Sequence, residues 1–412
     1  MRALYTVLLR LALPLVLLRL WWRGRREPGY RDAIPERLGR YETEAPPKLI
    51  WIHAVSVGEA RAAAPLVRAF TQALPDHHVL VTCTTAAGRE TVKQVYGEKV
   101  LASYLPYDFP ESVQSFLEHF RPRLGVLMET EVWPNLLAGC AQNGVPVLLA
   151  NARMSEKSAR AYARWRGLSR PAFAVLAAAC AQSAADAERL RALGAREVEV
   201  TGNLKFDVHP DAAQVAAGRA WRAALGRPVL LLASTRESEE RLLLDALPAW
   251  DGKLLVVVVP RHPQRFDEAA QWTQSRRTRT EMPDASDKTY LGDTMGEMAF
   301  YFAACDVAVI GGSFMPLGGQ NLIEALAVGA PVVVGPSMFN FAEATRLAVE
   351  AGAAVQALDA SAAIREALAL ITDAEKRNRM SFAGKKLCEA HRGATEKHLK
   401  RGLSLINGSA RG

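Results

Sequence analysis

The chain has 412 residues, half of them hydrophobic, and its 51 Lys and Arg against 43 Asp and Glu give a formal net charge of +8. Because this length exceeds what one hydrophobic core usually organises, we expect two domains of roughly 200 residues each. The basic balance indicates an anionic partner, but the cations are spread along the chain without a recognisable nucleic-acid module. The composition therefore argues against nucleic acid and favours an anionic lipid surface or a phosphorylated substrate.

Residues 3–22 are almost entirely apolar and about as long as a membrane span, although Arg10 and Arg19 interrupt them. A basic cluster over residues 23–26 follows, and no small-residue cleavage site comes after it, which argues against a cleaved signal peptide. We predict a membrane anchor over residues 1–27, either a single span or a helix lying in the interface, with the rest of the chain on the cytoplasmic side. A buried core helix is the remaining alternative.

Residues 28–208 form the first predicted domain, which opens on a charged segment containing Glu36 and Arg37. From residue 48 onward, strand-like and helix-like runs alternate, which predicts an α/β fold with a doubly wound, Rossmann-like parallel sheet. Such sheets bind ligands at the carboxyl ends of their strands. Candidate site residues follow the predicted strands at these ends: Ser56, Gly58, Glu59, Thr84, Thr85, Glu129, Glu131, Asn151 and Arg153.

Residues 209–412 form the second predicted domain, in which the alternation restarts at Pro228. Two doubly wound domains facing a cleft make that cleft the natural binding site. The helical tail, residues 360–405, is expected to pack across both domains, its last helix crossing back to the first. No CxxC spacing occurs, so we expect reduced core thiols in a cytosolic compartment at all five cysteines: Cys83, Cys140, Cys180, Cys305 and Cys388.

A glycine-rich stretch in the second domain predicts an anion-binding loop. A strand over residues 307–310 leads into Gly311-Gly312-Ser313, the pair Gly318-Gly319 follows, and residues 320–328 have the pattern of a helix. Glycines let the backbone approach a phosphate, and a helix N-terminus adds unpaired N–H groups. Polar residues are expected on the ligand side: Ser313, Gln320, Asn321 and Glu324. The alternative is an ordinary βαβ turn whose glycines serve only packing.

Three further loops should converge on the same edge of this sheet: Ser234-Thr235-Arg236, Pro260-Arg261-His262 and residues 293–297, with Gly296 and Glu297. Any one of them alone could be a helix cap, but together their hydroxyls and arginines favour a phosphate with further negative charge. No Walker A or GxGxxG motif is present, which argues against nucleoside triphosphates and dinucleotides. His262 is assigned to binding or backbone organisation, because no HxxxH or DxD pattern supports a metal site.

Motifs along nearly the whole chain resemble those of the 3-deoxy-D-manno-octulosonic acid (Kdo) transferases of lipopolysaccharide synthesis, in the order of that family. In the first domain they are PERLG (35–39), HAVSVGE (53–59), METEVWPN (128–135), NARMS (151–155) and TGNLKFD (201–207). In the second they are STRESEE (234–240), VPRHPQRF (259–266), GDTMGEM (292–298) and GGSFMPLGGQNLIEA (311–325).

The resemblance implies a GT-B fold, CMP-Kdo as donor, and the tetraacylated, doubly phosphorylated lipid A precursor as acceptor at the cytoplasmic face of the inner membrane. It implies transfer with inversion at the anomeric carbon, no metal or other cofactor, and Glu36 as general base. Glu129 and Glu131 are second candidates, for proton transfer or for orienting the acceptor. Inner-membrane lipid is the third expected partner, and no nucleic-acid partner is expected.

Donor binding is expected from the four loops of the second domain, with Glu324 reaching the ribose hydroxyls: Ser234, Thr235, Arg236, Pro260, Arg261, His262, Gly296, Glu297, Gly312, Ser313, Gly318, Gly319, Gln320, Asn321 and Glu324. Acceptor binding is assigned to Ser56, Gly58, Glu59 and Arg37. Two alternatives stay open. One is another GT-B enzyme, such as an epimerase, acting on a UDP-sugar; the other is a non-catalytic, membrane-bound binder of sugar nucleotides.

Overall fold

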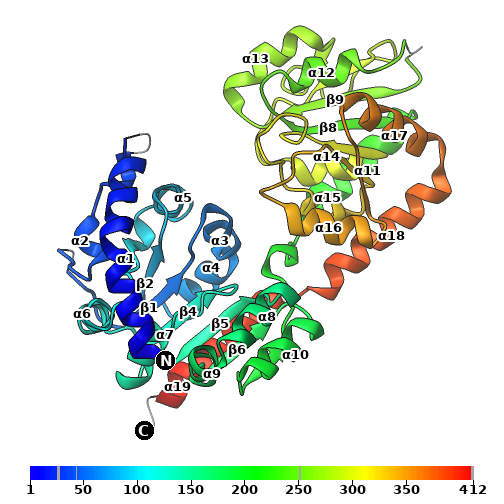
Figure 1. Cartoon of the computed structure of the whole chain (residues 1–412). Coiled ribbons are helices and arrows are strands. Elements are labelled where there is room, and N and C mark those ends of the chain that lie inside the picture. The colour runs from blue at the N-terminus through cyan, green and yellow to red at the C-terminus, as the bar shows by residue number, and fades with distance from the viewer. Residues whose placement is uncertain (26–27, 43, 250–251, 410–412) are drawn as a thin grey trace. The chain divides into compact units, whose positions relative to one another are not determined.

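The computed structural model describes residues 1–25, 28–42, 44–249 and 252–409 (Figure 1). Its contacts divide the chain into two compact units: unit 1 is Met1–Leu204 with Gly393–Gly412, and unit 2 is Lys205–Arg392. Each unit contains one seven-stranded sheet, and all described strand pairs are parallel. The predicted pair of doubly wound sheets is therefore confirmed.

Unit 1 has the strand order β3-β2-β1-β4-β5-β6-β7. The strands are β1 (Leu49–His53), β2 (His78–Cys83), β3 (Leu101–Tyr104), β4 (Leu124–Met128), β5 (Val147–Ala152), β6 (Ala178–Ala181) and β7 (Val198–Val200). Every residue of β1, β4 and β5 is buried, because helices cover both faces of the sheet. The order of strand addition reverses between β1 and β4, so a ligand crevice is expected at their carboxyl ends.

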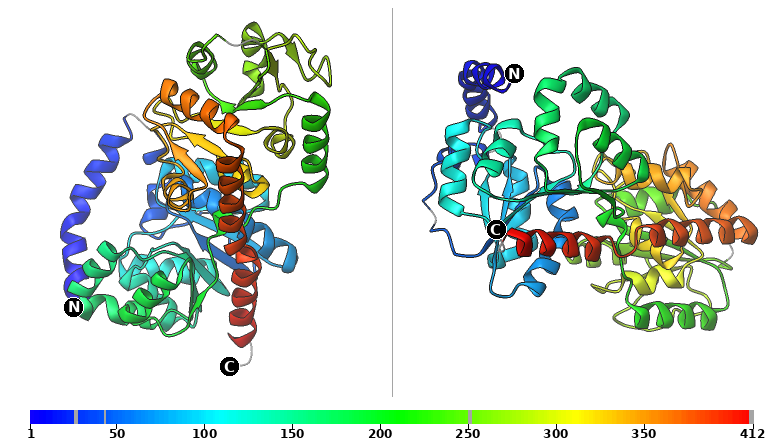
Figure 2. Two further views of the ribbon diagram at one scale, coloured as in Figure 1. Left: turned by 90° about the vertical axis from the view of Figure 1, so that its right-hand side faces the viewer. Right: turned by 90° about the horizontal axis from the view of Figure 1, so that it is seen from below.

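The helices of unit 1 are α1 (Arg2–Arg23), η1 (Pro28–Tyr30), α2 (Ile34–Arg37), α3 (Val57–Ala62), α4 (Ala64–Ala73), α5 (Ala86–Tyr96), η2 (Gly97–Lys99), α6 (Pro110–Phe120), α7 (Pro134–Gln142), α8 (Glu156–Arg164), α9 (Arg166–Ala174), α10 (Ala184–Leu193) and α19 (Ala394–Ser409). The last helix, α19, lies against α4 (Figure 2). A Cβ at Gly402 would lie 2.5 Å from Cζ of Phe70, so this contact requires glycine.

Helix α1 contacts unit 1 through one face only. Asn135 of α7 donates to Thr6 Oγ1 at 3.0 Å, and Arg10 pairs with Glu111 of α6 at 3.0 Å. The leucines of its other faces are exposed: Leu4, Leu8, Leu11, Leu15 and Leu18. Among the described residues, α1 alone has the length and hydropathy to cross a membrane. Arg26, the end of the predicted basic cluster, lies outside the described residues.

Unit 2 has the strand order β10-β11-β9-β8-β12-β13-β14, with its reversal between β8 and β12. The strands are β8 (Val229–Thr235), β9 (Leu255–Pro260), β10 (Ser275–Arg276), β11 (Thr289–Leu291), β12 (Val307–Ile310), β13 (Val332–Val334) and β14 (Ala354–Gln356). The helices are η3 (Leu204–Phe206), α11 (Ala212–Leu225), α12 (Glu239–Asp245), η4 (Pro263–Arg265), α13 (Phe266–Ala269), η5 (Ala270–Trp272), α14 (Met298–Ala304), α15 (Ile323–Val328), α16 (Ala342–Glu350), α17 (Ala360–Thr372) and α18 (Ala374–Ala390).

The helix predicted over residues 320–328 begins three residues later, at Ile323. The amides of Gly319 and Gln320 donate to the carbonyls of Gly312 and Gly311, at 2.7 and 3.1 Å, which holds these residues in the loop. Asn321 Oδ1 then accepts from Ile323 N at 3.0 Å, an Asx turn that ends the loop directly before the helix.

Candidate functional site

Glu36 is held by three donors from two different elements of unit 1. It lies on the short helix α2, and its side chain is 15% exposed. Oε1 accepts from Arg89 Nη2 of α5 at 2.9 Å, while Oε2 accepts from Ser103 Oγ at 2.8 Å and from the amide of Tyr104 at 2.7 Å, both in β3. These contacts fix the carboxylate at the carboxyl end of the sheet and leave part of it open to solvent.

Arg37, the next residue, is a buried guanidinium with unused donors. It is 2% exposed, Nη1 donates to the carbonyl of Thr84 at 2.9 Å, and its Cζ lies 3.7 Å from the centroid of the Tyr104 ring. Within the described part of the chain, its Nε and Nη2 have no hydrogen-bond partner. Because buried donors without acceptors are costly, this arrangement suits an incoming anion.

A group of carboxyls lies at the ends of β1 and β4. Ser56 and Glu59 form a capping box on α3: Glu59 N donates to Ser56 Oγ at 3.4 Å, and Val55 N donates to Glu59 Oε2 at 2.9 Å. Glu129 follows β4 with a φ of 58°, a left-handed conformation that is rare outside glycine. Glu131 accepts from Trp133 Nε1 at 2.7 Å.

Burial changes the pKa of two of these carboxyls, Glu59 and Glu131. It raises the pKa of Glu59 to about 7, and the neighbouring charge of Glu129 adds to the effect. Burial also raises the pKa of Glu131. Burial raises the pKa of the Cys83 thiol at the end of β2. The charges of Arg89, Arg37, Glu36 and Glu59 also act on this pKa. The structure therefore brings the Glu36 group and Glu59 around the end of one strand.

The elevated pKa of Glu59 has a consequence for stability that can be measured. Its pKa rises from 4.5 to about 7 on folding, so the folded state holds a proton that the unfolded state releases. This stabilisation is complete below the unfolded pKa and is lost as the pH rises through about 7. We expect the unfolding free energy of the wild type, relative to Glu59→Gln, to fall over this range in urea unfolding at a series of pH values. The exposed Glu98→Gln is the control, and a pH-independent difference between wild type and Glu59→Gln would contradict the expectation.

In unit 2, a buried carboxylate connects two of the four predicted donor loops. Glu239, fully buried at the start of α12, accepts from three backbone amides: Arg236 N at 2.9 Å, Gly312 N at 2.5 Å and Phe314 N at 2.9 Å. The next residue, Glu240, is also buried and accepts from Thr235 Oγ1 at 2.7 Å. Arg265 forms a two-point ion pair with Glu240, at 2.6 and 3.0 Å.

No role is predicted from the sequence for Glu239, Glu240 or Arg265. Two consecutive acids in the first turn of a helix such as α12 are a common pattern that the helix dipole favours, so the sequence alone does not indicate their burial. The position of Glu239 and Glu240 shortly after a predicted phosphate loop is the one feature of the sequence that could have indicated a role for them.

Most amides of the glycine loop already have acceptors within unit 2. Besides Gly312, Gly319 and Gln320, the amide of Gly318 donates to Ser337 Oγ at 3.2 Å. Ser313 was expected on the ligand side, but it is buried: its Oγ donates to Ile310 O at 2.5 Å and accepts from Gly335 N at 2.8 Å. These contacts give the loop a defined conformation in which most of its amides already have acceptors, so its side chains and the arginines near it are the groups that remain for the predicted phosphate.

The other predicted donor residues lie at the carboxyl edge of the same sheet. Pro260 ends β9, and the amide of Arg261 donates to Thr235 O at 2.9 Å, which joins the second loop to the first. Ser234 has a φ of 55° at an irregularity in β8. Burial and the charges of Arg236 and Arg261 lower the pKa of His262, so its imidazole is neutral near pH 7.

Glu297 and Glu324 also have partners within unit 2. Thr294 Oγ1 donates to Glu297, Arg277 pairs with the same carboxylate at 3.4 Å, and Gly296 beside it has a φ of 81°. Asn321 Nδ2 donates to Glu324 Oε1 at 2.9 Å. Among the described residues, no group of three or more His, Cys, Asp or Glu could hold a metal ion, and the expectation of metal-free chemistry stays a prediction.

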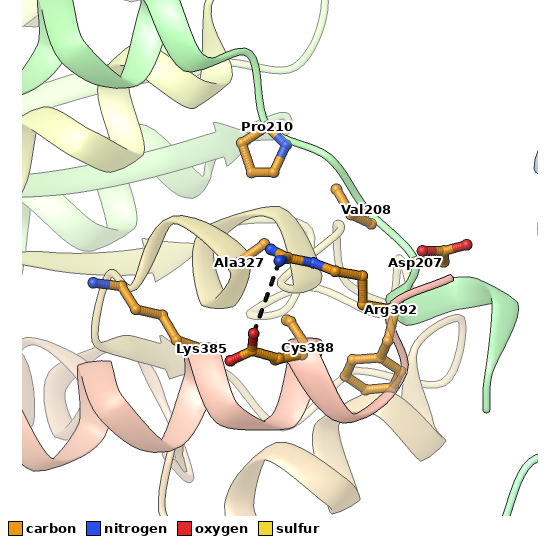
Figure 3. A pocket seen from close by; sticks show the side chains of 9 residues that line it. Asp207, Val208, Pro210, Ala327, Lys385, Cys388 and Arg392 are labelled. Carbon is orange, nitrogen blue, oxygen red and sulfur yellow. Dashed lines mark ion pairs between the residues drawn. The ribbon is translucent and has the colours of Figure 1, made fainter. Parts of the chain in front are cut away.

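A hollow of about 200 Å³ lies elsewhere in unit 2 (Figure 3). The segment Asp207–Pro210, Ala327 of α15 and the side chains of Lys385 and Cys388 surround it, with Arg392 paired to Glu389 at 3.8 Å. None of the predicted site residues lines this hollow, so it is separate from the donor loops.

Comparisons with known proteins agree with one another. A family model described as 3-deoxy-D-manno-octulosonic acid transferase (kdotransferase) matches residues 32–208. The chain is 46% identical to the 3-deoxy-D-manno-octulosonic acid transferase of Bordetella pertussis, over 97% of this chain and 98% of that protein. It is 34% identical to the Haemophilus influenzae protein of the same name, over 97% of each.

Solved structures resemble the chain as well. MurG of Acinetobacter baumannii is 14% identical, with a TM-score of 0.54 over 87% of this chain and 100% of that chain, and its likeness bears on the GT-B-like fold alone. The C-terminal CMP-Kdo binding domain of WaaA from the same organism is 32% identical, with a TM-score of 0.41 over 43% of this chain and 98% of that chain.

Proposed function

Because the chain belongs to the 3-deoxy-D-manno-octulosonic acid (Kdo) transferase family, we propose that it transfers Kdo from CMP-Kdo to the phosphorylated lipid A precursor. In this reaction an acceptor hydroxyl attacks C2 of Kdo from the face opposite the phosphate, which inverts the anomeric centre. The bond from C2 to the phosphate oxygen breaks, CMP leaves with the electron pair, and the hydroxyl proton passes to a base. The observation that carries the proposal is the Glu36–Arg37 pair at the end of the first sheet.

Glu36 is the proposed base. Arg89, Ser103 and the Tyr104 amide orient its carboxylate, so the base needs no rearrangement when the acceptor arrives. Its exposed part can then take the hydroxyl proton as the new C–O bond forms. The position of Glu36 on the segment that follows α1 supports a role with a lipid acceptor held at the membrane.

Arg37 is proposed to bind an anionic group of the acceptor. Its unpaired Nε and Nη2 form two parallel donors, and a guanidinium binds phosphate through such a pair. Glu59, Glu129 and Glu131 would orient the acceptor from the neighbouring strand ends. Since the pKa of Glu59 is about 7, its protonated form is available to donate a hydrogen bond near neutral pH.

Arg236 and Arg261 are proposed to stabilise the departing phosphate, with Glu324 at the ribose. The loops that carry the two arginines are joined by the hydrogen bond from Arg261 N to Thr235 O, which supports a role for both residues at the same edge, and Arg236 pairs with Glu237 at 3.1 Å. Stabilisation by fixed arginines is the reason to expect transfer without a divalent cation.

One assay distinguishes this proposal from the two alternatives. Purified protein is incubated with CMP-Kdo or UDP-N-acetylglucosamine, with and without the lipid A precursor and in the presence of EDTA. We expect acceptor-dependent release of CMP that EDTA does not reduce. Conversion of the UDP-sugar would support the epimerase-like alternative, and binding of CMP-Kdo without consumption would support the non-catalytic one.

We further propose that α1 lies in the membrane interface on the cytoplasmic side of the inner membrane. Its polar contacts, Thr6 with Asn135 and Arg10 with Glu111, support a helix that rests against unit 1, while its exposed leucines face lipid. A fully spanning helix would have to break these contacts.

Charge on the lipid-facing side of α1 is expected to detach the protein from membranes. Three substitutions together, Leu8→Asp, Leu11→Asp and Leu15→Asp, place carboxylates where apolar side chains are 57–72% exposed. We expect the membrane-bound fraction in vesicle sedimentation to fall at least about tenfold, because each burial of such a leucine contributes about 1.5–3 kcal/mol. Leu358→Asp, at an 87% exposed leucine in unit 2, is the control. Unchanged sedimentation of the triple variant would contradict an anchoring role for α1.

A further inference from the structure

A second hollow, of about 330 Å³, lies in unit 1 between α8, α9 and α10, on elements to which no step of the transfer has been assigned. Four arginines form its rim: Arg160, Arg166, Arg170 and Arg189. Its other lining residues, which we call the floor, are mostly apolar: alanines of α8 and α10, Leu193 and the buried Ser169. An open, apolar hollow with a guanidinium rim is an unusual surface, because it offers both charge and a place for methylene groups.

Among the described residues, part of the positive charge of the rim arginines is not paired with an acidic side chain. Arg160 pairs with Glu156 on its own helix, and Arg189 Nη1 donates to the carbonyl of Met154 at 3.1 Å. Arg166 and Arg170 are exposed and make no hydrogen bond or ion pair within the part of the chain that the structure describes. Residues 153–170 contain six cations and a single acid, Glu156, so a negative ligand would meet little repulsion.

The chemistry of the hollow favours a phosphate attached to an apolar body. Guanidinium groups bind phosphate oxygens through paired N–H donors and do so better than ammonium groups. A free phosphate ion would leave the alanine and leucine floor uncovered, whereas the glycerol and first methylenes of a lipid would cover it. The shared chemistry is the phosphate, and the floor selects the lipid as its source.

The hollow also lies beside the start of the anchor helix. A Cβ at Gly167 of α9 would lie 2.9 Å from Met1 Cγ, so the start of α1 touches the helix that carries Arg166 and Arg170. Trp165, between α8 and α9, is 58% exposed, and tryptophan is favoured at the headgroup level of a bilayer. A bilayer that receives the leucines of α1 would therefore have its headgroups within reach of this rim.

We propose that the hollow between α8, α9 and α10 binds the phosphate-bearing headgroup of an anionic bilayer lipid, as a second membrane contact beside α1. This inference rests on the membrane-bound function proposed above, but it concerns a lipid of the surrounding bilayer and not the acceptor. Stable attachment of a protein to a membrane usually takes two such signals, an apolar one and an electrostatic one. The hollow would supply the second and would fix the orientation of unit 1 on the surface.

Vesicle sedimentation of the full-length protein tests the site. With phosphatidylcholine vesicles containing phosphatidylglycerol, we expect the double variant Arg166→Ala/Arg170→Ala to bind about tenfold or more weakly than wild type. With pure phosphatidylcholine vesicles, the two proteins should bind alike. The matched control is Lys157→Ala/Arg164→Ala, which removes the same charge from α8 outside the rim and should lose much less. Equal losses in the two double variants would overturn the proposal in favour of a diffuse electrostatic field.

A second variant tests the hollow without changing its charge. Ala163→Gln places an uncharged polar side chain over the floor, and we expect it to weaken binding to phosphatidylglycerol vesicles several-fold while its thermal unfolding midpoint stays that of wild type. Undiminished binding would overturn the proposal. Inorganic phosphate at millimolar concentration should displace little protein; full displacement would identify soluble phosphate as the ligand and reject the lipid.

The vesicle-binding test of the hollow and the assay of the transfer reaction can succeed or fail independently. Transfer from CMP-Kdo to a detergent-dispersed acceptor needs no bilayer, so the Arg166→Ala/Arg170→Ala variant should keep wild-type turnover in that assay. Loss of vesicle binding in a chain that shows no transfer would support the hollow and refute the proposed reaction. Transfer by the wild type, together with vesicle binding that is unaltered in the Arg166→Ala/Arg170→Ala variant, would support the proposed reaction and refute the lipid site in the hollow.

Discussion

Glu36→Gln is expected to lower kcat for Kdo transfer by about 10²–10⁴-fold, the usual contribution of a general base. Glutamine preserves the shape of the side chain and can still accept from Ser103 and Tyr104, but it cannot take a proton from the acceptor. Because the substitution leaves unit 2 untouched, the affinity for CMP measured by calorimetry should stay that of wild type. Turnover is measured as CMP release under acceptor saturation.

The control for this variant is Asp32→Asn, an exposed carboxylate in the same charged segment, which should keep kcat within a factor of about two. Wild-type turnover by Glu36→Gln would remove Glu36 from the role of base and direct attention to the carboxyls after β1 and β4. Loss of CMP affinity together with turnover would instead point to a damaged fold.

Glu239→Ala should destabilise unit 2 by about 3–5 kcal/mol and abolish detectable donor binding. Removing this carboxylate leaves three buried amides, those of Arg236, Gly312 and Phe314, without their acceptor. The loops after β8 and β12 would then lose the group that joins them. Urea unfolding measures the stability, and titration with CMP measures the binding.

Two further variants sharpen this test. Glu239→Gln should retain only part of the stability and of the CMP binding. The side-chain NH2 group of glutamine replaces one carboxylate oxygen, and it would face backbone amides that are themselves donors. Glu237→Ala, two residues earlier in the chain at a side chain that is 58% exposed, should change the unfolding free energy by less than about 0.5 kcal/mol. Unaltered stability and CMP affinity in Glu239→Ala would show that the loops hold together without it.

Local pattern was enough to predict the sheets. The continuous apolar runs of β1 and β9 are those of strands buried on both faces, and the structure confirms them as central strands of parallel sheets. The start of α15 was predicted too early, because periodicity cannot reveal that the amides of Gly319 and Gln320 bond back to the loop.

The partners of the candidate site residues depend on contacts between distant segments. Arg89 lies 53 residues after Glu36 on a different helix, and only the packing of α2 against β3 and α5 brings the two together. Likewise, Glu239 and Gly312 are 73 residues apart, and nothing in either motif indicates that the Glu239 carboxylate accepts the hydrogen bond of the Gly312 amide. The motifs therefore predicted which residues form the candidate site, and the tertiary structure shows which of their groups already have partners within the chain.

Mass spectrometry of the lipid product tests the proposed function most directly. The wild-type protein is incubated with CMP-Kdo and the lipid A precursor, in parallel with Glu36→Gln, and the lipid is extracted and weighed. We expect the mass of the acceptor to rise by one or more whole Kdo residues with wild type and to stay unchanged with the variant over the same time. An unmodified acceptor with folded wild-type protein, or equal modification by both proteins, would contradict the account.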